Sequence, residues 1–224
     1  MHIKLRKCDC FEFIKQMPDK CIDVIIADPP YGISYQSGMR NSDDRFGVLQ
    51  NDTNDMRLQC YSELYRILKD DCFASIFCSY KNFAIDYVEL SKYFNIANVI
   101  VWYKGGGGIG NLKHLLTDYE LCIICSKGKA SIRGKRIGSV WYIKKVAPTK
   151  MVHPTEKPVM LMKLLLEKFS DMGDVCFDPF MGSGTVGIAC VKMGLDFIGC
   201  EIDDIYYNIA KERIKKVLEK GFTK

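Results

Sequence analysis

The sequence predicts an α/β protein built on an open, mostly parallel sheet, and three observations lead to this prediction. Short apolar runs of strand length alternate along the chain with patterns of helical period. One run ends in a Pro-Pro turn at residues 29–30, and a later one ends in a glycine-rich turn at residues 182–187 that opens a helix. Because open α/β sheets bind ligands at the carboxyl ends of their strands, both turns are candidate binding positions.

The expected elements follow one another in regular alternation. Strands are expected at residues 3–7, 22–27, 72–78, 96–103, 120–125, 175–177 and 197–200. Helices are expected at residues 11–17, from 55 to 68, at 82–93, from 155 through 165, and from the glycine turn through 191. Thr155 is the expected N-cap of its helix, with Pro158 in the first turn. Residues 32–52 are polar and lack periodicity, which is typical of a functional lid or binding loop.

The length and composition favour one domain over residues 1–224, with a small insertion. The chain has 224 residues, 48% of them hydrophobic, which is enough for one sizeable core. It has no apolar run long enough for a membrane span, and its first residues lack the apolar segment of a signal peptide. Eleven cysteines scattered through apolar runs indicate a reducing, cytoplasmic location. The pairs Cys8/Cys10 and Cys122/Cys125 have no second pair at zinc-finger spacing, so we expect no metal site.

The positive charge is concentrated in one segment. Residues 121–155 contain eight Lys and Arg and no Asp or Glu, whereas the whole chain has a net charge of +5, so the remainder is net acidic. Trp141 and Tyr142 lie among these cations. Since cations bind phosphates and aromatic rings stack on bases, the segment favours nucleic acid as a partner over a merely solvated loop. We expect a recognition insertion at about 105–152, with the candidate DNA-binding residues Lys127, Lys129, Arg133, Lys135, Arg136, Lys144 and Lys145.

Residues 27–32, Ala-Asp-Pro-Pro-Tyr-Gly, end the second expected strand. The two prolines fix the backbone and lack N–H groups, so nearby carbonyl groups are left to accept hydrogen bonds from a ligand. The Asp28 carboxylate, these carbonyls and the ring of Tyr31 together suit a planar group that bears an exocyclic amine. A plain turn at the end of a strand is the alternative interpretation.

Residues 175–187 form the second candidate site. Asp178 ends a strand, Gly182, Gly184 and Gly187 follow with the spacing of a nucleotide-binding turn, and Glu201 ends the next strand. Glycines allow close approach of the backbone, a helix N-terminus is electropositive, and a carboxylate accepts hydrogen bonds from ribose hydroxyls, so the turn suits a nucleoside ligand. A nicotinamide cofactor is the competing ligand, but Asp178 would repel its pyrophosphate and would instead attract an amino group.

Three motifs in this order resemble those of the β-class DNA amino-methyltransferases, which methylate N6 of adenine or N4 of cytosine. They are D-P-P-Y at 28–31, H-P-T-E-K-P at 153–158 and D-P-F-M-G-S-G-T at 178–185, and the resemblance covers essentially the whole chain. It implies a Rossmann-like fold that binds S-adenosyl-L-methionine, with a seven-stranded mixed sheet containing one antiparallel strand. It also implies a circularly permuted motif order, in which the catalytic motif precedes the cofactor motif, and a place in restriction–modification.

The resemblance also assigns roles to residues. The catalytic residues would be Asp28, Pro29, Pro30 and Tyr31. The cofactor-binding residues would be Asp9, Asp28, Thr155, Lys157, Asp178, Phe180, Gly182, Ser183, Gly184, Thr185, Glu201 and Ile202. Among them Asp9 would bond the adenine amine and Glu201 the ribose. Simpler alternatives are that Ile202 belongs to the core and that Lys157 is a solvated charge at a helix start.

The expected reaction is methyl transfer to the exocyclic N6 of an adenine flipped out of the duplex. Asp28 and the Pro29 carbonyl would accept the two amine hydrogens, and Tyr31 would stack on the base. An N4-cytosine enzyme is the nearest alternative, although such enzymes more often have Ser at the position of Asp28. A DNA-binding regulator that lost catalysis is a third. We count a homodimer among the expected assemblies, but the sequence gives neither the oligomeric state nor the DNA site.

Overall fold

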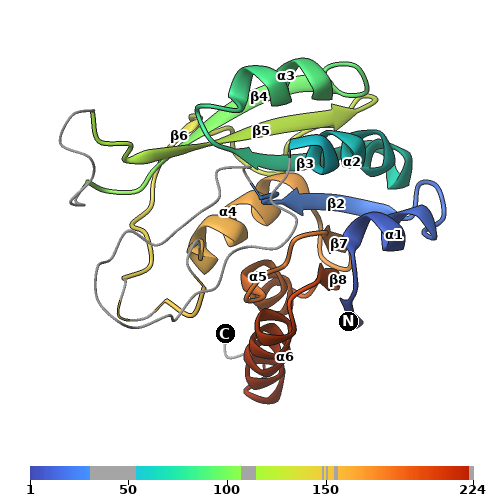
Figure 1. The fold of residues 1–224 in the computed structure, drawn as a ribbon, viewed down its shortest axis with the longest axis vertical. Coiled ribbons are helices and arrows are strands. Elements are labelled where there is room, and N and C mark those ends of the chain that lie inside the picture. Colours follow the sequence, from blue (N-terminus) through green and yellow to red (C-terminus); the bar gives the residue numbers. More distant parts are fainter. Residues whose placement is uncertain (31–53, 107–114, 148, 150, 154–155, 222–224) are drawn as a thin grey trace.

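The structure is a computed structural model that describes residues 1–30, 54–106, 115–147, 149, 151–153 and 156–221. In the described residues a single eight-stranded sheet lies between two layers of helices (Figure 1). Its strands are β1 (Ile3–Lys7), β2 (Ile22–Ala27), β3 (Leu68–Cys78), β4 (Asn95–Tyr103), β5 (Tyr119–Lys127), β6 (Val140–Tyr142), β7 (Val175–Asp178) and β8 (Asp196–Glu201). The expected lid at 32–52 lies outside the described residues.

The strand order is β1-β8-β7-β2-β3-β5-β4-β6. Only β5 runs against its neighbours, pairing antiparallel with both β3 and β4, whereas the other pairs are parallel. The mixed sheet with one antiparallel strand is therefore confirmed. The expected number of seven strands was wrong, because β6 adds an eighth, paired in parallel with β4. With three residues inside the basic segment, β6 is too short to produce a periodic pattern.

The helices are α1 (Cys10–Lys15), α2 (Asn54–Ile67), α3 (Phe83–Leu90), α4 (Val159–Phe169), α5 (Thr185–Met193) and α6 (Asp204–Glu219). The N-cap of α4 is Pro158 in an extended conformation, so the expectation that Thr155 caps this helix was wrong. Helix α6 was not among the expected elements, although Asp203 caps it by accepting hydrogen bonds from the backbone N–H groups of Ile205 and Tyr206.

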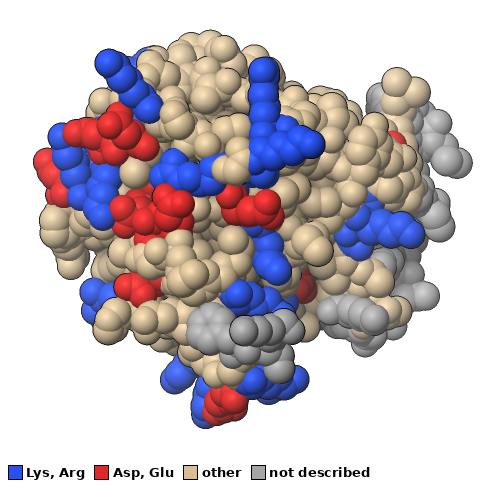
Figure 2. Space-filling model, turned by 180° about the vertical axis from the view of Figure 1, so that it is seen from behind, with Lys and Arg blue, Asp and Glu red and all other residues tan. Residues whose placement is uncertain are grey.

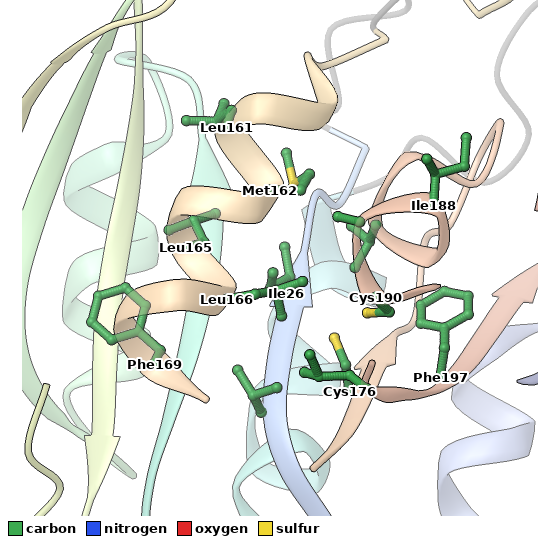
Figure 3. Packing of buried hydrophobic residues seen from close by; sticks show 14 of the residues in the cluster. Ile26, Leu161, Met162, Leu165, Leu166, Phe169, Cys176, Ile188, Cys190 and Phe197 are labelled. Atoms are coloured by element: carbon green, nitrogen blue, oxygen red, sulfur yellow. The ribbon is translucent and has the colours of Figure 1, made fainter. Parts of the chain in front are cut away.

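In the part of the chain that the structure describes, three helices cover each face of the sheet. Neighbouring residues of β2 alternate between the faces: Ile26 packs in the cluster that includes α4, α5 and α6, whereas Ile25 packs in the cluster that includes α1, α2 and α3. Figure 3 shows the first cluster, in which Leu166 of α4 lies beside Ile26 of β2. Burying apolar side chains on both faces makes the sheet a rigid support for the loops at its edges.

The two motif-bearing strands are neighbours. β2 and β7 pair in parallel, with Val24 opposite Cys176, so Asp28 after β2 and Asp178 at the end of β7 lie at the same edge of the sheet. From this pair the chain leaves in opposite directions, from β2 through α2 to β3 and from β7 through α5 to β8. A reversal of this kind creates the crevice in which open α/β sheets bind ligands.

All eleven cysteines are free thiols. Within the described part of the chain, no helix has the length and apolar character needed to cross a bilayer. Nor does any group of His, Cys, Asp or Glu among the described residues have the arrangement of a metal site.

Candidate active site

The carboxylate of Asp28 lies directly after β2 and faces a buried lysine. Lys157, whose side chain is 5% exposed, donates a hydrogen bond from Nζ to Asp28 Oδ2. The same Nζ lies 3.3 Å from Oε2 of Glu120 and 4.6 Å from the centre of the Phe77 ring. Lys157 is therefore not a solvated charge at a helix start. It joins the end of β2 to the start of β5.

Glu120 is a member of the site that sequence reasoning missed. It lies near the start of β5, and its Oε1 is 3.2 Å from Nζ of Lys104. Burial opposes ionisation, but the charges of Lys157 and Lys104 outweigh it and hold the pKa of Glu120 below its usual value. Likewise burial would lower the pKa of Lys157, yet Asp28 and Glu120 raise it. The signal in the sequence is an acidic residue at the head of an otherwise apolar strand.

The glycine turn after β7 has the conformation that its residues suggested. Gly182 and Gly184 have φ of +50° and +82°, in the left-handed region that favours glycine. A Cβ on Gly187 would lie 2.5 Å from Cδ1 of Ile214 and 2.8 Å from the Phe197 ring, so α5 packs against α6 and β8 only because this residue is glycine. The turn therefore places the N-terminus of α5 close to the sheet edge.

Two carboxylates border this turn. Glu201, at the end of β8, accepts hydrogen bonds from the backbone N–H groups of Gly182 and Asp203, both at 2.9 Å. Asp178 accepts one from the backbone N–H of Phe180 at 3.0 Å. Burial raises the pKa of Asp178 well above its usual value, and the carboxylates of Asp28 and Glu201 add to the effect. Burial also raises the pKa of Glu201, against the opposing effect of its backbone hydrogen bonds. The edge is therefore suited to a cationic ligand group.

The remaining expected cofactor residues lie around the same edge. Asp9 follows β1 and caps α1, accepting hydrogen bonds from the backbone N–H groups of Phe11 and Glu12. The preceding Cys8 donates its backbone N–H to the carbonyl of Glu201, so the ends of β1 and β8 are joined. Phe180 and Ile202 are half-buried, and Ser183 and Thr185 are buried. Tyr31 and Thr155 lie outside the described residues.

His153, at the start of the H-P-T-E-K-P stretch, packs beside the turn. Its ring centre lies 4.2 Å from that of Tyr206 on α6, and a Cβ on Gly182 would lie 3.4 Å from its Nε2. Burial and the charge of Lys157 lower the pKa of His153 to about 4, so the imidazole is neutral at physiological pH. It closes one side of the glycine turn as an uncharged aromatic group.

The basic segment does not form one surface. Lys127 is buried, and its Nζ donates hydrogen bonds to the backbone carbonyls of Tyr65 and Leu68 at 2.8 and 2.7 Å. The expectation that it binds DNA is therefore replaced by a structural role at the end of α2. Arg133 pairs with Asp171 at 2.7 Å, at the end of α4 that is remote from Lys157. Charge on the face shown in Figure 2 is also mixed, with Lys and Arg alternating with Asp and Glu.

The directions of β5 and β6 explain why the cations of the basic segment lie at different edges of the sheet. Because β5 is antiparallel, Glu120 lies at the edge of the site and Lys127 at the opposite edge, roughly 24 Å away for seven residue steps of about 3.4 Å. Lys129 and Lys135 follow Lys127 on that far side, where the carbonyl of Lys135 accepts a hydrogen bond from Lys168 of α4.

β6 then brings the chain back to the site, since it runs parallel to β4 and ends with Tyr142 opposite Tyr103. Trp141 is buried, contrary to its expected role among the cations, whereas Tyr142 is 77% exposed and packs edge-to-face on Tyr103. The exposed Lys144 and Lys145 follow, and the backbone N–H of Lys145 donates to the carbonyl of Lys104. Lys144 and Lys145 therefore follow a strand whose carboxyl end lies at the same edge of the sheet as Asp28.

Comparison with known proteins agrees with this geometry. The Type II methyltransferase M.HinfI of Haemophilus influenzae is 28% identical over 246 residues, which cover 94% of this chain and 68% of that protein. The DNA adenine methyltransferase YhdJ of Escherichia coli (strain K12) is 27% identical over 241 residues, which cover 92% of this chain and 80% of that protein.

Solved structures are similar over almost the whole chain. The M1.HpyAVI–SAM complex matches with a TM-score of 0.75 and 27% identity, covering 95% of this chain and 98% of that chain. The cytosine-N4-specific PvuII DNA methyltransferase matches with a TM-score of 0.76 at 15% identity, over 98% of this chain and 92% of that chain, a likeness of fold alone. A family model described as DNA methylase matches residues 22–212. The resemblance of the three motifs is thereby confirmed, and the chain belongs to the DNA methylase family.

Proposed function

We propose that this protein transfers a methyl group from S-adenosyl-L-methionine to N6 of an adenine that is flipped out of double-stranded DNA. The observation that supports it best is the charge pair at the end of β2, where the buried Lys157 fixes the Asp28 carboxylate at the sheet edge that also bears the glycine turn. The amine acceptor and the cofactor turn thus share one edge of the sheet. The supporting family match places the chain among DNA methylases.

The residues of the turn fit S-adenosylmethionine. Asp178 is a buried carboxyl whose pKa is raised, so pairing with the ammonium group of the methionine moiety would favour its ionised form. Glu201 already accepts two backbone N–H bonds, and a carboxylate can accept about four, which leaves acceptor sites for the ribose hydroxyls. When bound, the cofactor supplies an electrophilic methyl group on its sulfonium.

Asp28 and the backbone carbonyl of Pro29 would accept the two N–H bonds of the target amine and direct its lone pair towards the cofactor. Positive charge develops on that nitrogen in the transition state, and a fixed carboxylate stabilises it there. The ammonium group of Lys157 bonds Asp28 and also lies 3.3 Å from Oε2 of Glu120, so one buried cation holds the Asp28 carboxylate in place. Tyr31, two residues beyond Pro29, is proposed to stack on the flipped base.

Adenine N6 is proposed over cytosine N4 because Asp28 heads the D-P-P-Y motif and because one relative, YhdJ, is named a DNA adenine methyltransferase. The fold does not separate the two reactions, since a cytosine-N4-specific enzyme shares it. The proposed organisation is a single domain over 1–224 with a DNA-recognition insertion at about 105–152 and a circularly permuted motif order. The homodimer stays a prediction, as does the place in restriction–modification.

Incubation with duplex DNA and S-adenosylmethionine labelled on its methyl group tests the proposal. We expect label on DNA from the wild-type protein and N6-methyladenine after digestion, and sequencing of the modified positions gives the recognition site. Asp28→Ala is the matched inactive control. N4-methylcytosine would establish the alternative specificity. DNA and cofactor binding without any transfer would instead identify a regulator that has lost catalysis.

A further inference from the structure

Arg213 of α6 joins the glycine turn to the H-P-T-E-K-P stretch. Its Nη1 donates to the backbone carbonyl of Ser183 at 2.9 Å and to the Ser183 hydroxyl at 2.7 Å. Its Nη2 donates to Oε1 of Glu156. Glu156 is 5% exposed and uses its other oxygen to accept the backbone N–H of Val152 at 3.0 Å. Both side chains are therefore engaged in bonds to two separate segments.

Ser183 is the residue of the glycine turn that Arg213 contacts. It is buried and lies between Gly182 and Gly184, both in the left-handed region, and its carbonyl and hydroxyl both accept hydrogen bonds from Arg213. The turn is also held by Glu201, which accepts the backbone N–H of Gly182. Arg213 and Glu201 thus hold two consecutive residues of the same turn, Ser183 and Gly182.

The contact between Arg213 and Glu156 also bears on Lys157, the next residue in the chain. Glu156 is directed to α6 and the glycine turn, while the next residue, Lys157, is directed to Asp28 and Glu120. Because consecutive side chains contact the two halves of the site, a shift of Glu156 also displaces the lysine that holds Asp28. The arginine fork suits this task, since it donates to two segments at once and a lysine presents only a point charge.

We propose that Arg213 and Glu156 are positioning residues, which hold the cofactor turn and keep it in register with Asp28. The inference rests on the proposed function and extends it to the C-terminal helix. It predicts that Arg213→Met weakens cofactor binding about tenfold or more, since one charge-assisted hydrogen bond is worth about that factor. Glu156→Gln should produce a smaller loss, because Arg213 can still bond Ser183.

The experiment measures the dissociation constant of S-adenosylmethionine by calorimetry, together with its KM and kcat. Arg213→Lys should fall between wild type and Arg213→Met. The double variant Arg213→Met/Glu156→Gln should lose no more than Arg213→Met alone, because both substitutions break one network. Lys216→Met on the same helix controls for removal of a charge, and Val217→Ala controls for reduced stability of α6.

The outcomes distinguish a failure of the positioning role from a failure of the proposed methyltransferase function. If wild type fails to bind S-adenosylmethionine, both are overturned. If wild type binds it and folded Arg213→Met binds within twofold of wild type, only the positioning role is overturned. The same holds if Val217→Ala, at matched thermal stability, raises the cofactor KM as much as Arg213→Met, because the effect would then follow helix stability.

Discussion

The ammonium group of Lys157 donates a hydrogen bond to the carboxylate of Asp28, although 129 residues separate them in the sequence. The contact is buried on the lysine side, with 5% of that side chain exposed, whereas 25% of the Asp28 side chain is accessible. Because a quarter of the Asp28 side chain is accessible, a substrate can reach this carboxylate. The pair therefore fixes the carboxylate without removing it from the site.

Replacing Asp28 with Asn should leave the Pro-Pro turn in place but remove the anion. We expect kcat to fall by about 10²–10³, the cost of losing one preorganised group that meets charge in the transition state. Cofactor affinity should change little, since Asp178 and Glu201 are untouched. Methyl-transfer kinetics and calorimetry measure the two quantities. Asp204→Asn, at a carboxylate whose side chain is 70% exposed, is the matched control. Turnover near that of wild type would remove Asp28 from the chemistry.

Asp178→Asn should separate stability from binding. The pKa of Asp178 is raised in the folded protein, so the folded state keeps this proton to higher pH than the unfolded state. Its contribution to the free energy of unfolding therefore declines as pH rises above the unfolded value of about 3.9. The Asn variant lacks this decline and can still accept the N–H of Phe180. Without cofactor at neutral pH it should be at least as stable as wild type.

The same variant should bind S-adenosylmethionine more weakly by roughly 1.5–3 kcal/mol, because the ammonium loses its charged partner. Thermal unfolding across a pH series and calorimetry of cofactor binding test the two halves. A variant that is less stable at neutral pH and binds cofactor normally would show that Asp178 supports the fold alone.

The motifs could be read from the sequence because each is local. The Pro-Pro turn at 29–30 and the glycines of the 182–187 turn encode their own backbone conformations. Contacts between distant segments could not be read in this way. Glu120 and Arg213 gain their roles only when β5 and α6 are placed beside Lys157 and Ser183.

The basic segment at 121–155 shows most clearly what cannot be predicted from the sequence. Its charges are continuous in sequence but lie at two edges of the sheet. The antiparallel β5 takes the chain to the far edge, and the three-residue β6, parallel to β4, brings it back. The composition of a segment gives the sign of its net charge, whereas the direction of each strand decides at which edge of the sheet that charge lies.

Lys127→Met tests the structural role of the first cation in that segment. Methionine keeps the apolar stem but leaves the carbonyls of Tyr65 and Leu68 without their buried donor. The free energy of unfolding should fall by about 1–3 kcal/mol. Urea denaturation measures it, and DNA affinity of the folded variant should equal that of wild type. Weaker DNA binding at unchanged stability would return Lys127 to the DNA interface.

Two pairs of exposed lysines test where DNA lies. Lys144 and Lys145 follow β6 at the edge of the sheet that contains Asp28, whereas Lys129 and Lys135 lie beyond the opposite end of β5. A flipped base must reach Asp28, so the duplex should contact the first pair. Lys144→Ala/Lys145→Ala should weaken DNA binding and lower the slope of log K against log salt by roughly 0.9 for each phosphate that the protein no longer neutralises.

The variant Lys129→Ala/Lys135→Ala removes the same charge at the other edge and is the matched control. Its affinity and salt slope should stay near those of wild type, and both variants should bind S-adenosylmethionine normally because neither pair is among the expected cofactor-binding residues. Titration of a fluorescent duplex at several salt concentrations gives both quantities. Equal reductions in the two variants would mean that only net charge matters. A larger reduction at Lys129 and Lys135 would place the duplex on the far edge, where its bases could not reach Asp28.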